Sequence, residues 1–360
     1  MQPRTESVDL AEQGHRLDAS ALARWMRDHV DGCGGPLTVR KFDGGQSNPT
    51  YLLQTPTRRY VLRAKPAPAA RLLPTAHAIE REFRVMQALA PTEVPVPRVH
   101  ALCEDEAVIG RAFYIMAHVE GRVFWDQTLT DLPAPQRAAV YDEMNRVLAS
   151  LHRLDAVGLG LQDFGRPERY VARQVERWSG QYRATTTEEI VAMDRLMDWL
   201  PAHLPESAHS TQAEAIVHGD YRLDNLIFHP SEPRVVALLD WELSTRGHAL
   251  ADFSYHCMAW HIPHAEGRGL LGLDPLTEGI PSEAAYVQAY ARRMAWDADA
   301  IRHDWSYYLA YNLFRVASIL QGVAHRARQG TASNTRATAA AARVRPLAEL
   351  GWRHAQAHRE

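Results

Sequence analysis

The sequence predicts an α+β protein in two parts, an N-terminal part built around a small antiparallel sheet and a C-terminal part that is mostly helical. Short N-terminal segments alternate apolar and polar residues, as in RYVLRAK at 59–65, because neighbouring side chains of a strand point to opposite faces. Helices are indicated farther on, where apolar residues such as Val140, Met144 and Val147 recur at three- and four-residue intervals. The 360 residues suit two domains or one large two-lobed domain.

The composition narrows the classes of protein and of partner. Hydrophobic residues make up 46% and charged residues 23%, as in ordinary globular proteins. A formal net charge of −3 provides no basic field for nucleic acid, so that partner is not expected. Three cysteines at unrelated spacings indicate neither a disulfide framework nor a metal clip. The N-terminus shows no apolar leader and no apolar run approaches the ~18 residues that cross a bilayer, so a cytoplasmic location without a membrane partner is expected.

Periodicity and turn residues predict the remaining elements in chain order. The glycine-containing segment 43–49 separates two strands, where it forms either a plain turn or a loop whose N–H groups cover phosphate oxygens. Helices are expected at 19–30, 76–90, 133–154, 284–294 and 304–328, and strands at 37–42, 50–54, 59–65, 101–103, 107–108 and 112–117.

The stretch IVHGDYRLDNLIFHPSEPRVVALLDWEL at 216–243 concentrates the polar residues that point to chemistry. The segments 226–228 and 235–239 are apolar and the turn-forming residues HPSEP lie between them, so a strand, a turn and a second strand are expected. This pairing would bring Asp220, Asn225 and Asp240 to one end of the ladder.

A phosphoryl-transfer reaction would use these three side chains. A hydroxyl that attacks a terminal phosphate needs a carboxylate to orient or take its proton, and magnesium needs hard oxygen ligands. Asp220 suits the first task, while Asn225 and Asp240 suit the second. The spacing of HGDYRLDN matches the H-R-D-x-x-x-x-N loop of protein kinases. An Asp or Asn in a turn often only caps backbone groups, but the ordered set including His218 favours the chemical interpretation.

HGDxxxxN followed by a strand that ends in DWE resembles the aminoglycoside phosphotransferase and choline kinase-like family of small-molecule kinases. YVARQVERW at 170–178 is similar to a subgroup whose phosphotransferase domain is fused to acyl-CoA dehydrogenases. The resemblance extends from about residue 37 to about residue 325. It implies a protein-kinase-like two-lobe fold, with a nucleotide-binding lobe at 1–117, a catalytic and acceptor-binding lobe at 118–360, and ATP in the crevice between them.

The resemblance also implies roles for the residues of the central stretch. Asp220 is the expected catalytic base and His218 precedes it in the catalytic loop. Arg222 is expected near the transferred phosphate, where it would stabilise transition-state charge. Asn225 and Asp240 are the expected magnesium ligands.

A second group of residues is implied to hold the nucleotide. Arg63 stands where family members often have lysine and would hold phosphates, although Lys65, on the same face of the strand, is the alternative. Glu82 would pair with that basic group. Ser47 would lie near the tip of the covering loop, and the adenine would meet backbone groups of Met116, Ala117, His118 and Val119.

We therefore expect ATP- and Mg²⁺-dependent transfer of the γ-phosphate to a hydroxyl of a small molecule, by a monomer or homodimer. The segments 160–200 and 284–328 are rich in arginine, tyrosine and tryptophan, which favours an anionic or aromatic acceptor such as a hydroxyacyl-CoA. The alternatives are an aminoglycoside kinase, a nucleotide-binding pseudokinase with Arg63 in the lysine position, and a metal hydrolase. The resemblance further implies that Asp252 steadies the catalytic loop.

Overall fold

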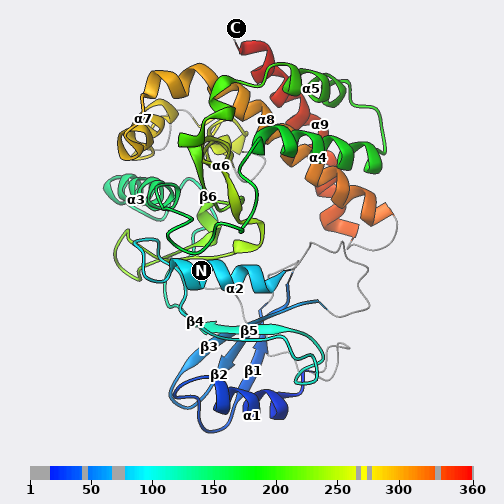
Figure 1. The fold of residues 1–360 in the computed structure, drawn as a ribbon. Coiled ribbons are helices and arrows are strands. Elements are labelled where there is room, and N and C mark those ends of the chain that lie inside the picture. Colours follow the sequence, from blue (N-terminus) through cyan, green and yellow to red (C-terminus); the bar gives the residue numbers. More distant parts are fainter. Residues whose placement is uncertain are drawn as a thin grey trace. The chain divides into compact units, whose positions relative to one another are not determined.

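The computed structural model describes residues 17–42, 48–66, 78–264, 269–273, 278–328 and 334–358 (Figure 1). The chain divides into two compact units. Unit 1 comprises Met1–Trp125, Val157–Leu161 and Arg222–Ser244, and unit 2 comprises Asp126–Ala156, Gln162–Tyr221 and Thr245–Glu360. The chain therefore returns twice to unit 1, whereas the sequence-based division at residues 117 and 118 assumes a single boundary.

Unit 1 is built around a five-stranded antiparallel sheet with the strand order β1-β2-β3-β5-β4. Residues 107–108 form no strand and lie in a turn, because the side chain of Asp105 accepts a hydrogen bond from the Ala107 N–H at 2.9 Å. The described elements of this part are β1 Thr38–Lys41, β2 Thr50–Gln54, β3 Arg59–Ala64, β4 Val99–Cys103, β5 Phe113–Ala117, α1 Ala19–His29 and α2 Ile79–Leu89.

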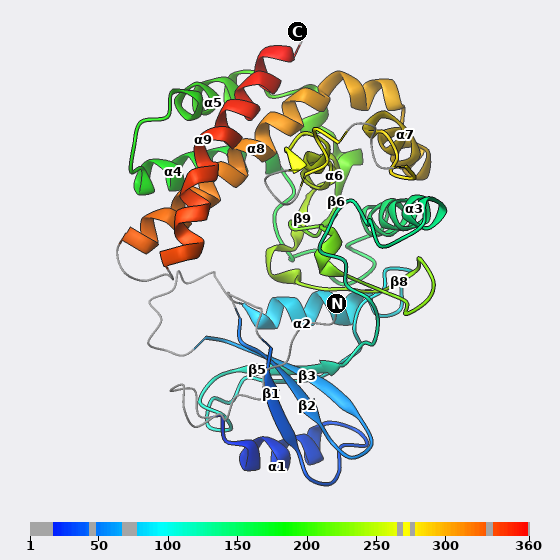
Figure 2. The ribbon, with the colours of Figure 1, turned by 180° about the vertical axis from the view of Figure 1, so that it is seen from behind.

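The two faces of the sheet have different partners. Tyr60 and Leu62 of β3 are buried in a core cluster with Leu22 and Met26 of α1. Because side chains alternate along a strand, Arg63 lies on the opposite face, which α2 covers (Figures 1 and 2). Strand alternation thus places the apolar cluster at α1 and the side chain of Arg63 on opposite faces of the sheet.

A two-stranded hairpin completes unit 1. It pairs β7 (Leu226–Phe228) with β8 (Val235–Leu238) in the antiparallel sense. The short helical turns η3 (Leu223–Asn225) and η4 (Trp241–Leu243) flank it. The Leu239 N–H donates to the Asn225 carbonyl at 2.9 Å, so Asn225 and Asp240 lie at the same end of the hairpin, as the sequence predicts for these two of its three residues.

Unit 2 is mostly helical, and α9 packs along the 31-residue helix α8 (Figure 2). The strand β9, which periodicity does not indicate, forms because Thr245–His248 pairs with Glu214–Val217. Within the described part of the chain, no helix has the length and apolar character needed to cross a membrane. The elements are α3 Ala134–His152, α4 Tyr170–Thr185, α5 Val191–Ala202, η1 Glu206–His209, η2 Thr211–Ala213, β6 Glu214–Val217, β9 Thr245–His248, α6 Ala249–Cys257, η5 Met258–Trp260, α7 Glu283–Met294, α8 Ala298–Arg328 and α9 Asn334–Ala357.

Gly121→Ala is expected to destabilise unit 1. A Cβ at this position would lie 2.2 Å from the Phe228 carbonyl oxygen and 2.4 Å from Cγ2 of Ile227. The backbone there is pinned, because Arg122 and Phe228 exchange two N–H···O bonds of 2.8 Å. Overpacking of this kind costs about 1–3 kcal/mol, which unfolding in urea followed by circular dichroism would measure.

Gly180→Ala is the matched control. Gly180 lies in α4 and a Cβ there meets nothing within 4 Å, so the change should leave stability unchanged or raise it by up to about 1 kcal/mol through helix propensity. Equal unfolding free energies for Gly121→Ala and the wild type would show that the hairpin can move away from this glycine.

Candidate active site

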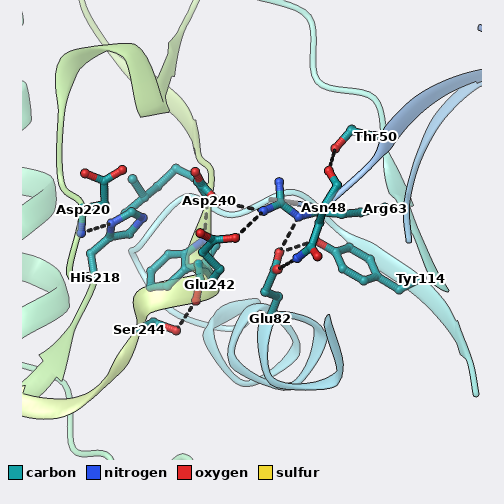
Figure 3. Close-up of polar contacts among 12 residues, drawn as sticks. Asn48, Thr50, Arg63, Glu82, Tyr114, His218, Asp220, Asp240, Glu242 and Ser244 are labelled. Carbon is teal, nitrogen blue, oxygen red and sulfur yellow. Dashed lines mark hydrogen bonds and ion pairs between the residues drawn. The ribbon is translucent and has the colours of Figure 1, made fainter. Parts of the chain in front are cut away.

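Arg63 is the centre of a charged group in unit 1, the Arg63 cluster, formed by Arg63, Glu82, Asp240 and Glu242 (Figure 3). Its Nε lies 2.8 Å from Oε2 of Glu82. Its Nη2 lies 2.8 Å from Oδ1 of Asp240 and 3.5 Å from Oε2 of Glu242. The planar guanidinium presents several donors in a fixed fork, so one arginine joins α2 to the chain that follows β8. The compact ammonium of a lysine presents no such fork.

Glu82 is the buried member of the cluster, with 1% of its surface exposed. Its Oε1 accepts a hydrogen bond of 2.8 Å from Asn48 and its Oε2 accepts one of 3.0 Å from Tyr114 (Figure 3). Burial raises the pKa of Glu82, and the charge of Arg63 opposes that rise. Burial would lower the pKa of Arg63, but Glu82 and the other carboxylates outweigh it and raise this pKa, so the guanidinium stays charged.

Asp240 and Asn225 are the two oxygen-bearing side chains at one end of the β7–β8 hairpin. Asp240 has φ 67° and ψ 61°, a left-handed conformation that aspartate and asparagine tolerate better than most residues. Its side chain is 34% exposed. Asn225 is held at the end of η3, where its N–H donates to the Arg222 carbonyl at 3.0 Å. Carboxylate and amide oxygens are donors that suit a magnesium ion.

The other residues expected to bind the nucleotide differ in how well their contacts fit that role. Lys65 forms an ion pair with Glu80, whereas Arg63 is the basic residue that forms an ion pair with Glu82. The N–H groups of Ala117 and His118 already donate to the carbonyls of Arg98, at 2.8 Å, and Arg59, at 3.4 Å. Met116 lies in β5 between β3 and β4 and pairs with Val61 and Val99, so an adenine at 116–119 would have to use other backbone groups, such as those of Val119. Ser47 lies outside the described residues.

The loop His218-Gly219-Asp220 in unit 2 follows β6 and is held through its backbone by α6. Asp252 accepts hydrogen bonds from the N–H groups of His218, at 2.7 Å, and Gly219, at 2.8 Å. Gly219 has φ 81°, a conformation that favours glycine. The His218 ring is buried, and its Nδ1 accepts the Asp220 N–H at 3.2 Å (Figure 3). This arrangement suits a histidine that shapes the loop.

Asp252 remains ionised despite its burial. Burial acts to raise its pKa, but the hydrogen bond from His152, together with the effects of His152 and His218, outweighs burial, so the pKa is lowered. Nε2 of His152 lies 3.2 Å from Oδ2 of Asp252, and Nδ1 lies 2.6 Å from the Tyr290 hydroxyl. The charged carboxylate therefore keeps both loop amides in place.

Asp220 points its carboxylate at a residue that sequence patterns do not single out. The Tyr255 hydroxyl donates to Oδ1 of Asp220 at 2.5 Å. Arg315 of α8 donates to the Gly219 carbonyl at 2.7 Å. In unit 1, Arg222 precedes η3, and its Nη2 lies 3.5 Å from Oδ2 of Asp224.

Sequence patterns miss several polar partners of the site: Asn48, Tyr114, Glu242 and Tyr255. Two of them carry a usable signal. Tyr255 follows Asp252 by three residues on one helix, a spacing that puts both on one face. Asn48 lies in the polar segment just before β2. Tyr114 carries no such signal, since its position in the strand could equally be core or surface. Glu242 belongs to the DWE motif, but that motif assigns a role only to Asp240.

Comparisons with known proteins agree with this architecture. Residues 38–302 match the model of the family described as phosphotransferase enzyme family. A candidate aminoglycoside phosphotransferase from Ralstonia eutropha, of known crystal structure, is 54% identical and has a TM-score of 0.87, over 96% of this chain and 100% of that one. Spectinomycin phosphotransferase, solved with ADP and spectinomycin, is 12% identical over 94% of this chain and 99% of its own, with a TM-score of 0.60. That likeness concerns the fold alone.

Two curated relatives are longer proteins. Acyl-CoA dehydrogenase family member 10 of Mus musculus is 45% identical over 88% of this chain, and acyl-CoA dehydrogenase family member 11 of Homo sapiens is 39% identical over 96%. This chain spans 29% of the first and 44% of the second. The predicted α+β kinase-like fold class and the predicted resemblance are confirmed, and the chain belongs to the phosphotransferase enzyme family.

Proposed function

We propose that the protein transfers the γ-phosphate of ATP to a hydroxyl group of a small molecule, with magnesium. The observation that carries this proposal is the Arg63 cluster, in which one guanidinium joins a buried glutamate to an aspartate at the hairpin end. The kinase template requires a basic residue held by a helix glutamate and a metal-binding aspartate that follows a strand. Membership of a phosphotransferase family supports the same reaction class.

Asn225 and Asp240 would hold the metal, and Arg63 would contact phosphate oxygens. Structural neighbours have been solved with ADP, or with AMP-PNP and Ca²⁺, which supports a nucleotide and a divalent cation as ligands. A bound magnesium ion neutralises charge on the phosphates during transfer. Arg63 presents several donors, so it can keep Glu82 through Nε while Nη2 turns to a phosphate.

Asp220 would orient the acceptor hydroxyl and take its proton, and Arg222 would stabilise charge on the transferred group. The geometry of the HGD loop supports the first role, because Asp252 and Arg315 hold the backbone on both sides of Gly219. His218 then acts as a positioning residue whose buried ring accepts the Asp220 N–H.

An anionic or aromatic-bearing acceptor, such as a hydroxyacyl-CoA, is the proposed substrate class. Cationic and aromatic side chains lie close together in unit 2, where the guanidinium of Arg177 lies 5.0 Å from the Trp178 ring centroid. The similarity to acyl-CoA dehydrogenase family members supports the same class. The name of the Ralstonia eutropha relative favours an aminoglycoside instead, and a comparison of acceptors distinguishes the two.

MgATP is expected to raise the melting temperature of the wild type and to do so less in Asp240→Asn. A ligand at a hundred times its Kd adds about 2.7 kcal/mol of stability. Asparagine tolerates the left-handed backbone at this position but lacks the charge that holds magnesium. Differential scanning fluorimetry with ATP, with and without Mg²⁺, measures the ligand-induced shift in each variant.

Asp142→Asn is the control, since Asp142 is a 65% exposed carboxylate that pairs with Arg293. Its MgATP shift should equal that of the wild type. An equal shift in Asp240→Asn would remove Asp240 from the metal site, and a shift produced by a transition metal but not by ATP would favour a hydrolase.

Asp220→Asn and Arg222→Ala are expected to lower turnover more than ATP binding, because both side chains act on the transferring group. Loss of a positioned base costs about 10²–10⁴ in rate. Phosphate release or transfer from γ-labelled ATP gives kcat, and the thermal shift gives binding.

Arg234→Ala is the control, because Arg234 is a 54% exposed arginine in the turn of the β7–β8 hairpin. It should keep the wild-type kcat and the wild-type ATP binding. Normal turnover in Asp220→Asn would contradict the assignment of the base, and binding without turnover in the wild type would indicate a pseudokinase.

Transfer from labelled ATP should favour hydroxyacyl-CoA or aromatic alcohols over aminoglycosides. A polycationic antibiotic needs an acidic cleft, whereas the helices of unit 2 supply arginines and aromatic rings. Thin-layer separation of products across a panel of the three acceptor classes measures the preference. Higher kcat/KM for aminoglycosides than for the other two classes would contradict the proposed acceptor.

A further inference from the structure

The Tyr255 side chain contacts the carboxylate of Asp220. It lies on α6, three residues after Asp252, so one face of this helix presents both side chains to the HGD loop. Asp252 binds the backbone of the loop, at the N–H groups of His218 and Gly219. Tyr255 instead binds the carboxylate, with its hydroxyl donating to Oδ1 of Asp220 at 2.5 Å.

This hydrogen bond differs from those of other tyrosines in unit 2. The hydroxyls of Tyr221 and Tyr307 donate to backbone carbonyls, at 2.8 and 3.0 Å, and both residues are fully buried. Tyr255 is only partly buried, and its acceptor is a carboxylate. Hydrogen bonds from a hydroxyl to a charged carboxylate are shorter and stronger than those between neutral groups. The contact therefore fixes a charged side chain and does more than satisfy a buried hydroxyl.

Arg315 fixes the tyrosine ring in turn. Its guanidinium lies 5.0 Å from the Tyr255 ring centroid and 6.0 Å from that of Trp178. The same guanidinium donates to the Gly219 carbonyl at 2.7 Å, and the residue is only 7% exposed. One buried cation thus contacts both the ring of Tyr255 and the backbone next to Asp220. These two contacts hold the ring in place relative to the loop.

We propose that Tyr255 is a positioning residue that helps to set the rotation of the Asp220 carboxylate, which receives the proton of the acceptor hydroxyl. This rests on the proposed function. In the transfer step the acceptor oxygen bonds to the γ-phosphorus, and the bond from that phosphorus to the bridging oxygen breaks with its electron pair remaining on ADP. The hydroxyl proton passes to the Asp220 carboxylate. The terminal torsion of an aspartate is broad and nearly two-fold, so the hydrogen bond from Tyr255 narrows the range of orientations of the carboxylate.

Tyr255→Phe tests the role, because phenylalanine keeps the ring that lies against Arg315 and removes only the hydroxyl. Misalignment at a reacting centre costs on the order of 10²-fold in rate, so kcat should fall by about 10- to 100-fold. The KM for ATP and the melting temperature should stay near wild-type values. The rate is measured as hydrolysis of MgATP with water as the acceptor, and as transfer to any alcohol identified in the panel.

Tyr307→Phe is the matched control, since it removes one hydroxyl and one hydrogen bond from a tyrosine that touches neither Asp220 nor its loop. It should keep the wild-type kcat. The double variant Asp220→Asn/Tyr255→Phe should be no slower than Asp220→Asn alone, because residues that act as a unit are not additive. A purely structural role for Tyr255 would instead lower the rate of the double variant further.

Two results would overturn the inference: a wild-type kcat in Tyr255→Phe, or rate losses that multiply in the double variant. Failure of the underlying function has a separate signature. A wild-type protein that binds MgATP but neither hydrolyses nor transfers it would overturn the proposed function, and the inference with it.

Discussion

The buried ion pair between Arg63 and Glu82 is the interaction on which the charged face of unit 1 depends. Glu82 is almost completely buried, so its charge needs a partner at 2.8 Å and two further donors, Asn48 and Tyr114. Removing one partner of such a pair leaves an uncompensated buried charge. The sheet, α2 and the chain after β8 are therefore held together by the same residues that we propose to meet the nucleotide.

Unit 2 also contains a buried charge with several partners, the carboxylate of Asp252. The carboxylate of Asp252 holds the loop His218-Gly219-Asp220 by accepting hydrogen bonds from two backbone N–H groups. His152 keeps that carboxylate charged, and Arg315 holds the carbonyl of the same loop. In unit 1 a buried charge joins side chains from distant segments, whereas in unit 2 a buried charge holds the backbone of a turn.

The sequence predicts the elements of this protein better than their partners. Alternation correctly separates Tyr60 and Leu62 from Arg63, and apolar spacing correctly finds α1, α2, α3 and α7. Strand β9 escapes prediction because TRGH has no strand pattern and depends on pairing with β6. Residues 107–108 look like a strand, but the side chain of Asp105 forms a turn there. The sequence does not predict that Tyr255 contacts Asp220 or that Glu242 contacts Arg63, because these contacts form only on folding.

The return of the chain to unit 1 has a consequence for how the protein acquires its structure. Residues 222–244 belong to this unit although unit 2 segments precede and follow them. On the ribosome, where chains emerge from the N-terminus, strands β1–β5 are complete long before β7 and β8 are made. The two backbone hydrogen bonds between Arg122 and Phe228 can therefore form only after Phe228 has been synthesised. A fragment that stops at Trp125 therefore lacks the hairpin and Asp240, and so does not contain the whole of unit 1.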